Sequence, residues 1–105
     1  MATIIISETF TDAPGGRLRS DGPKSGEEFR NDFLIPVFDK LTESEQITID
    51  LDGCFGYATS FLEEVFGGLS REYGAKKVLE KLKFKSDEEP LLITEIQEYI
   101  KDASK

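Results

Sequence analysis

The sequence contains no histidine and no tryptophan, and Cys54 is its single cysteine. Without histidine, the chain can form neither a Ser-His-Asp nor a Cys-His catalytic arrangement, and histidine-ligated zinc sites are excluded as well. One cysteine can supply neither a cysteine-type zinc site nor an internal disulfide, which suits a reducing compartment. These absences favour binding over acid–base catalysis, and we expect neither a metal nor a cofactor.

Long apolar runs are also missing. The longest are only a few residues, far short of the roughly 20 that a membrane-spanning helix needs. The N-terminus lacks the basic patch followed by an apolar stretch that is typical of a secretory signal. We therefore expect a soluble, cytoplasmic protein that does not bind a membrane.

Basic residues are scarce, because 13 Lys and Arg stand against 21 Asp and Glu and give a formal net charge of −8. Recognition of nucleic acid needs clustered Lys and Arg, so nucleic acid is not an expected partner. Residues 1–73 carry 14 acidic and 6 basic side chains, whereas residues 74–105 carry seven of each. We expect a partner surface in the acidic first two-thirds of the chain.

The length of 105 residues predicts a single domain over residues 1–105. Leu, Ile, Val and Phe make up 30 of these residues, well above the level of about 20% below which chains stay disordered. β-branched or alternating segments predict strands at residues 3–6 and 47–51, and the charged segment 82–85 predicts an edge strand. Within the loop of residues 7–25, residues 16–20 could form a further short strand.

Two capping boxes predict helix starts. In the first, Ser25 and Glu28 precede a stripe of apolar residues at steps of four, and Pro36 predicts a kink or a break near residues 32–36. This stripe consists of Phe29, Phe33, Val37 and Leu41.

The second capping box consists of Ser60 and Glu63, and the helix that it opens is expected to end at Gly74. Its apolar face consists of Leu62, Val65, Phe66, Leu69 and Tyr73. The Gly67-Gly68 pair inside it indicates either another backbone at close approach or a helix that ends early.

A short helical segment is predicted over residues 75–81, and Pro90 is expected to open a terminal helix. The apolar stripe of that terminal helix consists of Leu92, Ile96, Tyr99 and Ala103. The element order is therefore β-(β)-α-β-α-β-α, which predicts an α/β fold with a mostly parallel or mixed sheet.

Asp50 and Asp52 form an Asp-x-Asp-Gly sequence that is similar to the nucleophile motif of haloacid-dehalogenase-type phosphatases. Cys54 replaces the usual threonine, and too little chain follows for the rest of that fold. We interpret Asp52 and Gly53 as the end of a strand and its turn. A Mg²⁺-dependent phosphotransferase that uses both aspartates is the less favoured alternative.

Residues 56–64 are the segment richest in functional groups. Thr59 and Ser60 are expected just beyond the carboxyl end of a strand and at a helix N-terminus, a position that favours anions and phosphorylation. The alternative is that one hydroxyl simply caps the helix. Glu63 and Glu64 fall in its first turn, where the helix dipole stabilises carboxylates, and Cys54 is expected to be a small buried apolar residue.

Arg17, Arg19 and Lys24 form a basic cluster in a glycine-rich loop. This loop could meet an acidic partner or a phosphate, or it could be an ordinary solvated loop.

The strand of residues 47–51, the Asp52-Gly53 turn and the Thr59-Ser60 pair at the start of an amphipathic helix together resemble a STAS domain, known from anti-sigma factor antagonists and sulfate transporters. The segments 22–30 and 56–69 are similar to a bacterial STAS-like family of unknown function, over about residues 15–99. This resemblance implies a four- or five-stranded mixed sheet with helices mainly on one face.

The resemblance also implies a role for Ser60. It corresponds to the serine that a kinase partner phosphorylates in anti-sigma factor antagonists, where phosphate breaks binding to that partner, and Thr59 corresponds to the hydroxyl residue before it. Around this pair, Ala58 and Phe61 stand where the family usually has aspartate and glycine.

We therefore expect a non-enzymatic, regulatory protein–protein interaction module with Ser60 or Thr59 as phosphoacceptor. Its partner would be another regulatory protein, for which a histidine-kinase-type ATPase is the candidate. The expected partner-binding residues are Gly56, Tyr57, Phe61, Glu63, Glu64, Arg17, Arg19 and Lys24. The alternative function is binding of a small anionic ligand or of a nucleotide phosphate.

Overall fold

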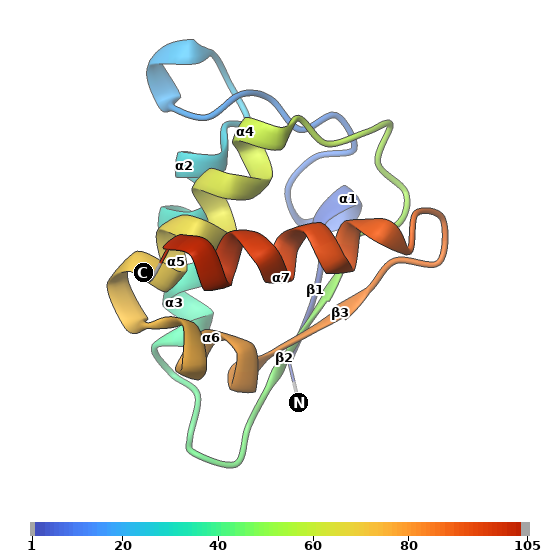
Figure 1. The fold of residues 1–105 in the computed structure, drawn as a ribbon. Helices are drawn as coiled ribbons and strands as arrows, with labels where there is room; N and C mark the ends of the chain where they lie inside the picture. The colour runs from blue at the N-terminus through green and yellow to red at the C-terminus, as the bar shows by residue number, and fades with distance from the viewer. Residues whose placement is uncertain (1, 104–105) are drawn as a thin grey trace.

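The computed structural model describes residues 2–103 and shows one sheet packed against helices (Figure 1). The strands are β1 (Ala2–Ile5), β2 (Ile47–Asp50) and β3 (Leu82–Lys85). They lie in the order β1-β2-β3 and are all parallel, with Ile49 of β2 opposite Ile4 on one side and Phe84 on the other. The parallel strands agree with the mostly parallel alternative that the element order predicted, whereas the four or five strands and the mixed sheet implied by the resemblance are not confirmed among the described residues.

The sheet buries one face. Ile4, Ile47, Ile49 and Leu82 are nearly or fully inaccessible and belong to the single hydrophobic core, whereas Thr3, Lys83 and Lys85 are exposed. Both crossovers step in the same direction along the sheet, and right-handed crossovers of this kind lie on the same face. The helices therefore cover mainly one face, as the resemblance implied.

The first crossover is a continuous helix made of α2 (Gly26–Phe29), η2 (Arg30–Leu34) and α3 (Ile35–Phe38). As predicted, the hydroxyl of Ser25 caps it and accepts a hydrogen bond from the amide of Glu28 at 3.1 Å. The segment η2 is a wider π-type turn that ends at Leu34, two residues before Pro36. The wider turn accommodates the missing N–H and the ring of Pro36, so the helix does not break there.

The second crossover helix consists of α4 (Thr59–Leu62), the π-type turn η3 (Glu63–Gly67) and α5 (Gly68–Tyr73). It ends at Gly74 as predicted, and the φ of 90° at this residue is one that favours glycine. The predicted capping box at Ser60 is wrong, because the helix begins at Thr59 and its N-cap residue, Ala58, makes no side-chain cap. The helix α6 (Ala75–Lys81) follows.

The two glycines inside this helix accommodate side chains, not the second backbone that the sequence suggested. A Cβ atom on Gly68 would overlap the guanidinium of Arg30 and lie 2.9 Å from its Cζ. A Cβ atom on Gly67 would overlap the carboxylate of Glu63. The close backbone approach occurs instead at Gly26, where a Cβ atom would lie 2.8 Å from the carbonyl oxygen of Phe61.

The terminal helix α7 (Leu91–Ala103) begins directly after Pro90 and lies across the helical layer (Figure 1). Leu92, Ile96 and Ile100 are its buried residues. The predicted stripe is therefore correct at Leu92 and Ile96, but Tyr99 is only half-buried.

The segment before the first crossover contains α1 (Ile6–Thr9) and the short 3₁₀ turn η1 (Arg19–Asp21). The short strand expected over residues 16–20 is not formed. The carboxylate of Asp21 accepts a hydrogen bond from the amide of Leu18 at 3.0 Å and closes a turn there instead. Backbone hydrogen bonds from Gly15 to Lys24 and from Gly26 to Gly16 hold the two ends of this loop together.

Candidate functional site

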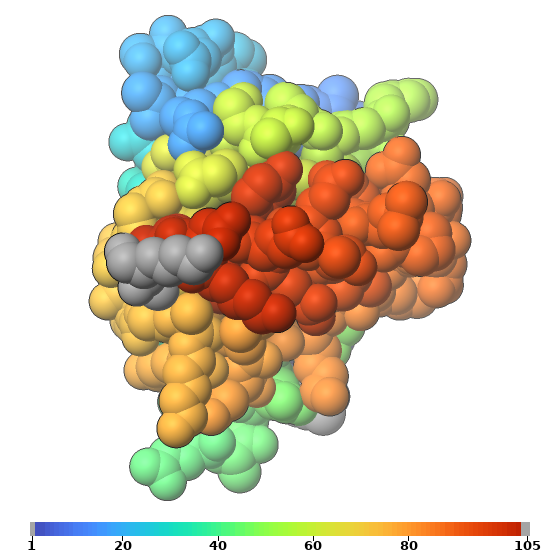
Figure 2. Space-filling view, viewed as in Figure 1, coloured from blue at the N-terminus to red at the C-terminus, as the bar shows by residue number. Residues whose placement is uncertain are grey.

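The candidate site lies where the carboxyl ends of β2 and β3 meet the start of α4. In open sheets of parallel strands this end commonly carries the ligand or partner site. Figure 2 shows the loop of residues 10–25 and the start of α4 gathered at one end of the molecule, with the loop that precedes β2 at the other end. The loop of residues 51–58, which leads from β2 to α4, forms the centre of the site.

Contacts within this loop and two contacts with the segment after α1 hold it in place. The hydroxyl of Tyr57 donates to the carbonyl of Leu51 at 2.8 Å and lies 3.1 Å from the sulfur of Cys54. The thiol of Cys54 in turn contacts the carbonyl of Thr11 at 3.5 Å, and the amide of Phe55 donates to the carbonyl of Asp12 at 2.9 Å. The anchored loop has little freedom to rearrange.

Burial affects the protonation of the Tyr57 hydroxyl and the Cys54 thiol. It raises the pKa of the Tyr57 hydroxyl far above its ordinary value near 10 and also raises the pKa of the Cys54 thiol. Both groups are therefore protonated at neutral pH. Cys54 is half-buried, less enclosed than the sequence predicted, and its thiol is not activated as a nucleophile.

Asp52 joins β2 to the turn that precedes α7. Its carboxylate accepts hydrogen bonds from the amides of Glu88 at 3.0 Å and Asp87 at 3.1 Å, and from the ammonium of Lys85 at 2.9 Å. The Glu88 amide foremost, with Lys85, lowers the pKa of Asp52 to about 2. The same ammonium lies 4.0 Å from Asp50, so a cation of the chain itself balances both aspartates.

This geometry supports the interpretation of Asp52 as the end of a strand. Within residues 2–103, no group of three or more His, Cys, Asp or Glu side chains is arranged to hold a metal ion. Asp50 also accepts a hydrogen bond from the amide of Asp52 at 3.0 Å, a contact typical of a tight turn.

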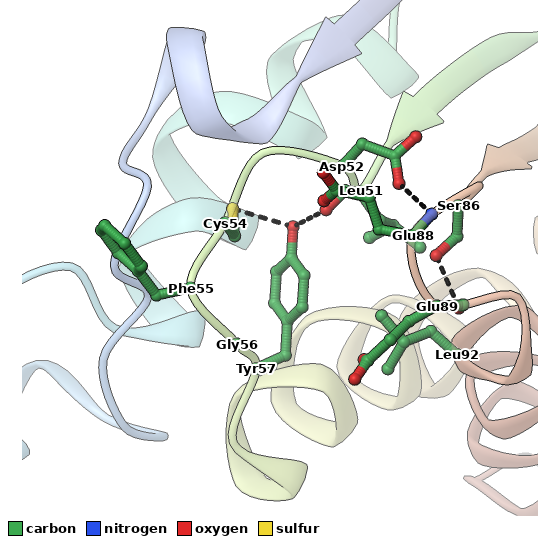
Figure 3. Close-up of a pocket in the computed structure, with 10 residues that line it drawn as sticks. All are labelled: Leu51, Asp52, Cys54, Phe55, Gly56, Tyr57, Ser86, Glu88, Glu89 and Leu92. Atoms are coloured by element: carbon green, nitrogen blue, oxygen red, sulfur yellow. Dashed lines mark hydrogen bonds between the residues drawn. The ribbon is translucent and has the colours of Figure 1, made fainter.

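A cavity of about 190 Å³ opens beside this turn (Figure 3). Its walls come from the loop after β2, the turn after β3 and the first turn of α7. The lining residues are Leu51, Asp52, Cys54, Phe55, Gly56, Tyr57, Ser86, Glu88, Glu89 and Leu92. The lining includes three carboxylates and no basic side chain, so the cavity is unsuited to phosphate.

Phe55 is the most exposed large apolar residue of the site, with 89% of its surface accessible. Figure 3 shows its ring directed away from Tyr57, on the outer side of the loop, and Phe55 is also one of the residues that line the cavity. The sequence analysis did not single it out. The available signal was its position between Gly53 and Gly56, because an aromatic residue in such a turn has no strand or helix to direct it inward.

The predicted phosphoacceptors lie at the open end of α4. Thr59 is exposed and Ser60 is half-buried. Phe61, by contrast, is fully buried, and its ring packs near those of Phe10, Phe29 and Tyr57. The expectation that Phe61 contacts a partner is therefore corrected, because its side chain belongs to the core.

The structure brings Arg17 together with Glu63 and Glu64, but as an internal cluster of ion pairs. Arg17 lies 2.6 Å from Glu63 and 3.3 Å from Glu64, while Arg71 lies 2.8 Å from Glu63 and Arg30 lies 2.5 Å from Glu64. The hydrogen bond from Arg71, followed by that from Arg17, lowers the pKa of Glu63. The cluster fastens the loop of residues 15–25 to the second crossover helix.

The other two basic residues of the loop point elsewhere. Arg19 forms an ion pair with Asp32 at 2.8 Å, and the ammonium of Lys24 lies 5.2 Å from the centre of the Phe10 ring. Each of the three predicted basic residues therefore contacts a different part of the chain. They do not converge on one anion site.

The fold and the site define a small α/β domain with parallel strands whose candidate binding end lies at the start of the second crossover helix. The model of a family described as a STAS-like domain of unknown function (DUF4325) matches residues 25–92. The chain belongs to this STAS-like family, which confirms the resemblance drawn from the sequence. No curated protein and no solved structure matches the chain.

Over residues 2–103, every helix is too short or too polar to cross a bilayer.

Proposed function

We propose that this chain is a non-enzymatic, regulatory protein-interaction module whose contact surface lies on the loop after β2 and the start of α4. We call this region the α4 surface and define it by Phe55, Gly56, Thr59 and Ser60. The observation that carries the proposal is the exposed ring of Phe55 on an anchored loop.

The anchoring distinguishes Phe55 from an apolar residue on a slack loop. Hydrogen bonds fix the loop at Phe55 itself and at Tyr57, so the ring remains in water while its backbone is held in place. Burying a side chain of this size in a partner would contribute about 1.5–3 kcal/mol. Rigid aromatic side chains also dominate the binding energy of many interfaces, because little entropy is lost when they bind.

Phosphorylation of Thr59 or Ser60 would change the same surface. A phosphate adds about −1.5 to −2 charge, and the first amides of α4 lack a side-chain cap that would compete with it. It would also bring negative charge close to Glu63, one turn further along the helix, where Arg17 already binds. We propose, following the family resemblance, that a histidine-kinase-type ATPase is the partner and that phosphate weakens its binding.

In this proposal Glu63, Glu64 and Arg17 support the surface more than they contact the partner, since their charges are paired with one another. Binding of a small anion is less favoured. The cavity beside the site is lined by Asp52, Glu88 and Glu89, which would repel a phosphate.

Site-specific photo-crosslinking tests the proposal. A photoreactive phenylalanine analogue is placed at Phe55, and as a control at Glu43, an exposed position in the loop before β2 at the opposite end of the molecule. In cells that encode the chain, we expect position 55 to capture one ATPase reproducibly and position 43 not to capture it. Equal capture at both positions, or none at position 55, would overturn the proposed function.

A further inference from the structure

A second surface lies beside the α4 surface and has a different chemistry. The cavity of about 190 Å³ adjoins a shallow groove of about 320 Å³ along the first turn of α7, and the two share Glu88, Glu89 and Leu92. We call these two adjoining depressions together the α7 groove. Its large apolar side chains come from Leu51, Phe55, Tyr57, Pro90, Leu91 and Leu92, and its acidic ones from Asp52, Glu88, Glu89 and Glu95.

The apolar part of the groove includes a leucine that the fold leaves in water. Leu91 is 77% exposed at the first position of α7, while its neighbour Leu92 turns inward and is 9% exposed. Together with Pro90, these residues form one wall of the α7 groove. This wall can accept an apolar side chain without any rearrangement of the core.

The acidic part is not balanced from within the described chain. Asp52 is satisfied by Lys85 and by two amides, and one oxygen of Glu88 accepts a hydrogen bond from the amide of Gly53 at 2.8 Å. No described cation pairs with Glu88, Glu89 or Glu95, and Lys85, the cation at this turn, is already bound by Asp50, Asp52 and Asp87. Figure 3 shows the carboxylate of Glu89 turned toward the Tyr57 side of the cavity.

We infer that the α7 groove binds a peptide segment of a partner protein in which a Lys or Arg stands next to a large apolar residue. The basic side chain would lie along Tyr57 with its charge between Glu88 and Glu89, and the apolar one would cover Leu91. Charge complementarity selects this occupant, because an anion would be repelled and a simple polyamine would leave Leu91 in water. The inference rests on the proposed function and adds the α7 groove to the α4 surface as a second region that contacts the partner protein.

The test uses a random-peptide library displayed on phage and selected on the wild-type protein. We expect the enriched peptides to contain Lys or Arg beside Leu, Ile or Phe. Their affinity is then measured for Glu89→Gln/Glu95→Gln and for Leu91→Ser. Both variants keep the fold, because they change exposed side chains that make no hydrogen bond within the described chain.

The matched control is Glu72→Gln/Glu98→Gln, which changes the net charge equally at exposed positions outside the groove. The groove variants should weaken binding of the selected peptide at least tenfold, and the control less than twofold. An equal loss in the control, enrichment of peptides without basic residues, no enrichment, or competition by spermidine at the same concentration as the peptide would each overturn the inference.

The two proposals fail separately. Thr59→Ala should leave the affinity of the selected peptide unchanged within twofold, because Thr59 belongs to the α4 surface and does not line the groove. A peptide whose binding depends on Thr59 but not on Leu91 would overturn the groove and leave the α4 surface intact. Failure of crosslinking from position 55 would remove the proposed function while the groove could still bind its peptide.

Discussion

The guanidinium of Arg30, in the first crossover helix, lies over Gly68 of the second crossover helix. It also reaches Glu64, which lies one turn before Gly68 in that second helix. The Nη1 atom of Arg30 donates to a carboxylate oxygen of Glu64 at 2.5 Å and to the backbone carbonyl oxygen of Glu64 at 2.5 Å. The two crossover helices are thus joined where each contains a π-type turn. Because Arg17 binds the same carboxylate, this contact also supports the loop beside the α4 surface.

Gly68→Ala should destabilise the protein by about 1–3 kcal/mol, although alanine is the better helix former. The added methyl group would overlap the guanidinium of Arg30, which is itself held by Glu64. Urea unfolding at neutral pH measures the change.

Two variants control this measurement. Gly16→Ala should change stability by less than about 0.5 kcal/mol, since its Cβ atom would meet only ordinary contacts. Arg30→Ala combined with Gly68→Ala should cost less than the sum of the single changes. Strict additivity would show that the two residues do not interact.

Phe55→Ala and Phe61→Ala should differ strongly in their effect on the free energy of unfolding, although the two residues lie close in sequence. Phe61 is fully buried among other rings, so its truncation should cost about 3–5 kcal/mol. Phe55 is largely exposed, so its truncation should change stability by less than about 0.5 kcal/mol. Thermal and urea unfolding of the two variants compare them directly, and comparable losses would contradict the assignment of Phe55 to the surface.

The pH dependence of stability should report on Asp52. Its pKa is about 2 in the folded protein and near 3.9 in an unfolded chain, so the folded state favours the charged form. This stabilisation is complete above about pH 4 and is lost as the pH falls through about 2. The difference in stability between wild type and Asp52→Asn should therefore shrink between pH 4 and pH 2. A difference that stays constant over this range would contradict the contacts with Glu88 and Lys85.

Phosphorylation should be visible as a mass increase of about 80 Da after incubation with the captured ATPase and ATP. We expect Thr59→Ala/Ser60→Ala to abolish it. Ser70→Ala is the control, because Ser70 is buried and its hydroxyl donates to the carbonyl of Ile100 at 2.6 Å. Absence of the heavier species in wild type, or its persistence in the double variant, would rule out the proposed phosphoacceptors.

Local sequence signals predicted much of the fold. The alternating residues 47–51 gave the central strand, and the Ser25 cap and the stop at Gly74 lie where the spacing placed them. Pro36 correctly predicted a change in helix geometry over residues 32–36, although the helix forms a wider π-type turn there and does not break. These features depend on residues that are close in the sequence, so they can be predicted without a structure.

The errors arose where distant parts of the chain decide the outcome. The Gly67-Gly68 pair signals close approach, but only the fold shows that the side chain of Arg30 is what approaches. Its position beside Ser60 made Phe61 a candidate for partner contact. In the folded chain Phe61 lies on the core-facing side of its helix, among the rings of Phe10 and Phe29. The basic loop looked like an open surface, but Arg17 is paired with carboxylates more than 40 positions away.

The affinity of the captured partner for Phe55→Ala tests the central claim most directly. Isothermal titration calorimetry compares wild type, Phe55→Ala and Glu43→Ala, all of which should retain the same unfolding midpoint. If the α4 surface binds the partner, Phe55→Ala should weaken binding at least tenfold, or about 1.4 kcal/mol, while Glu43→Ala binds as wild type does. Equal affinity of wild type and Phe55→Ala would contradict the account.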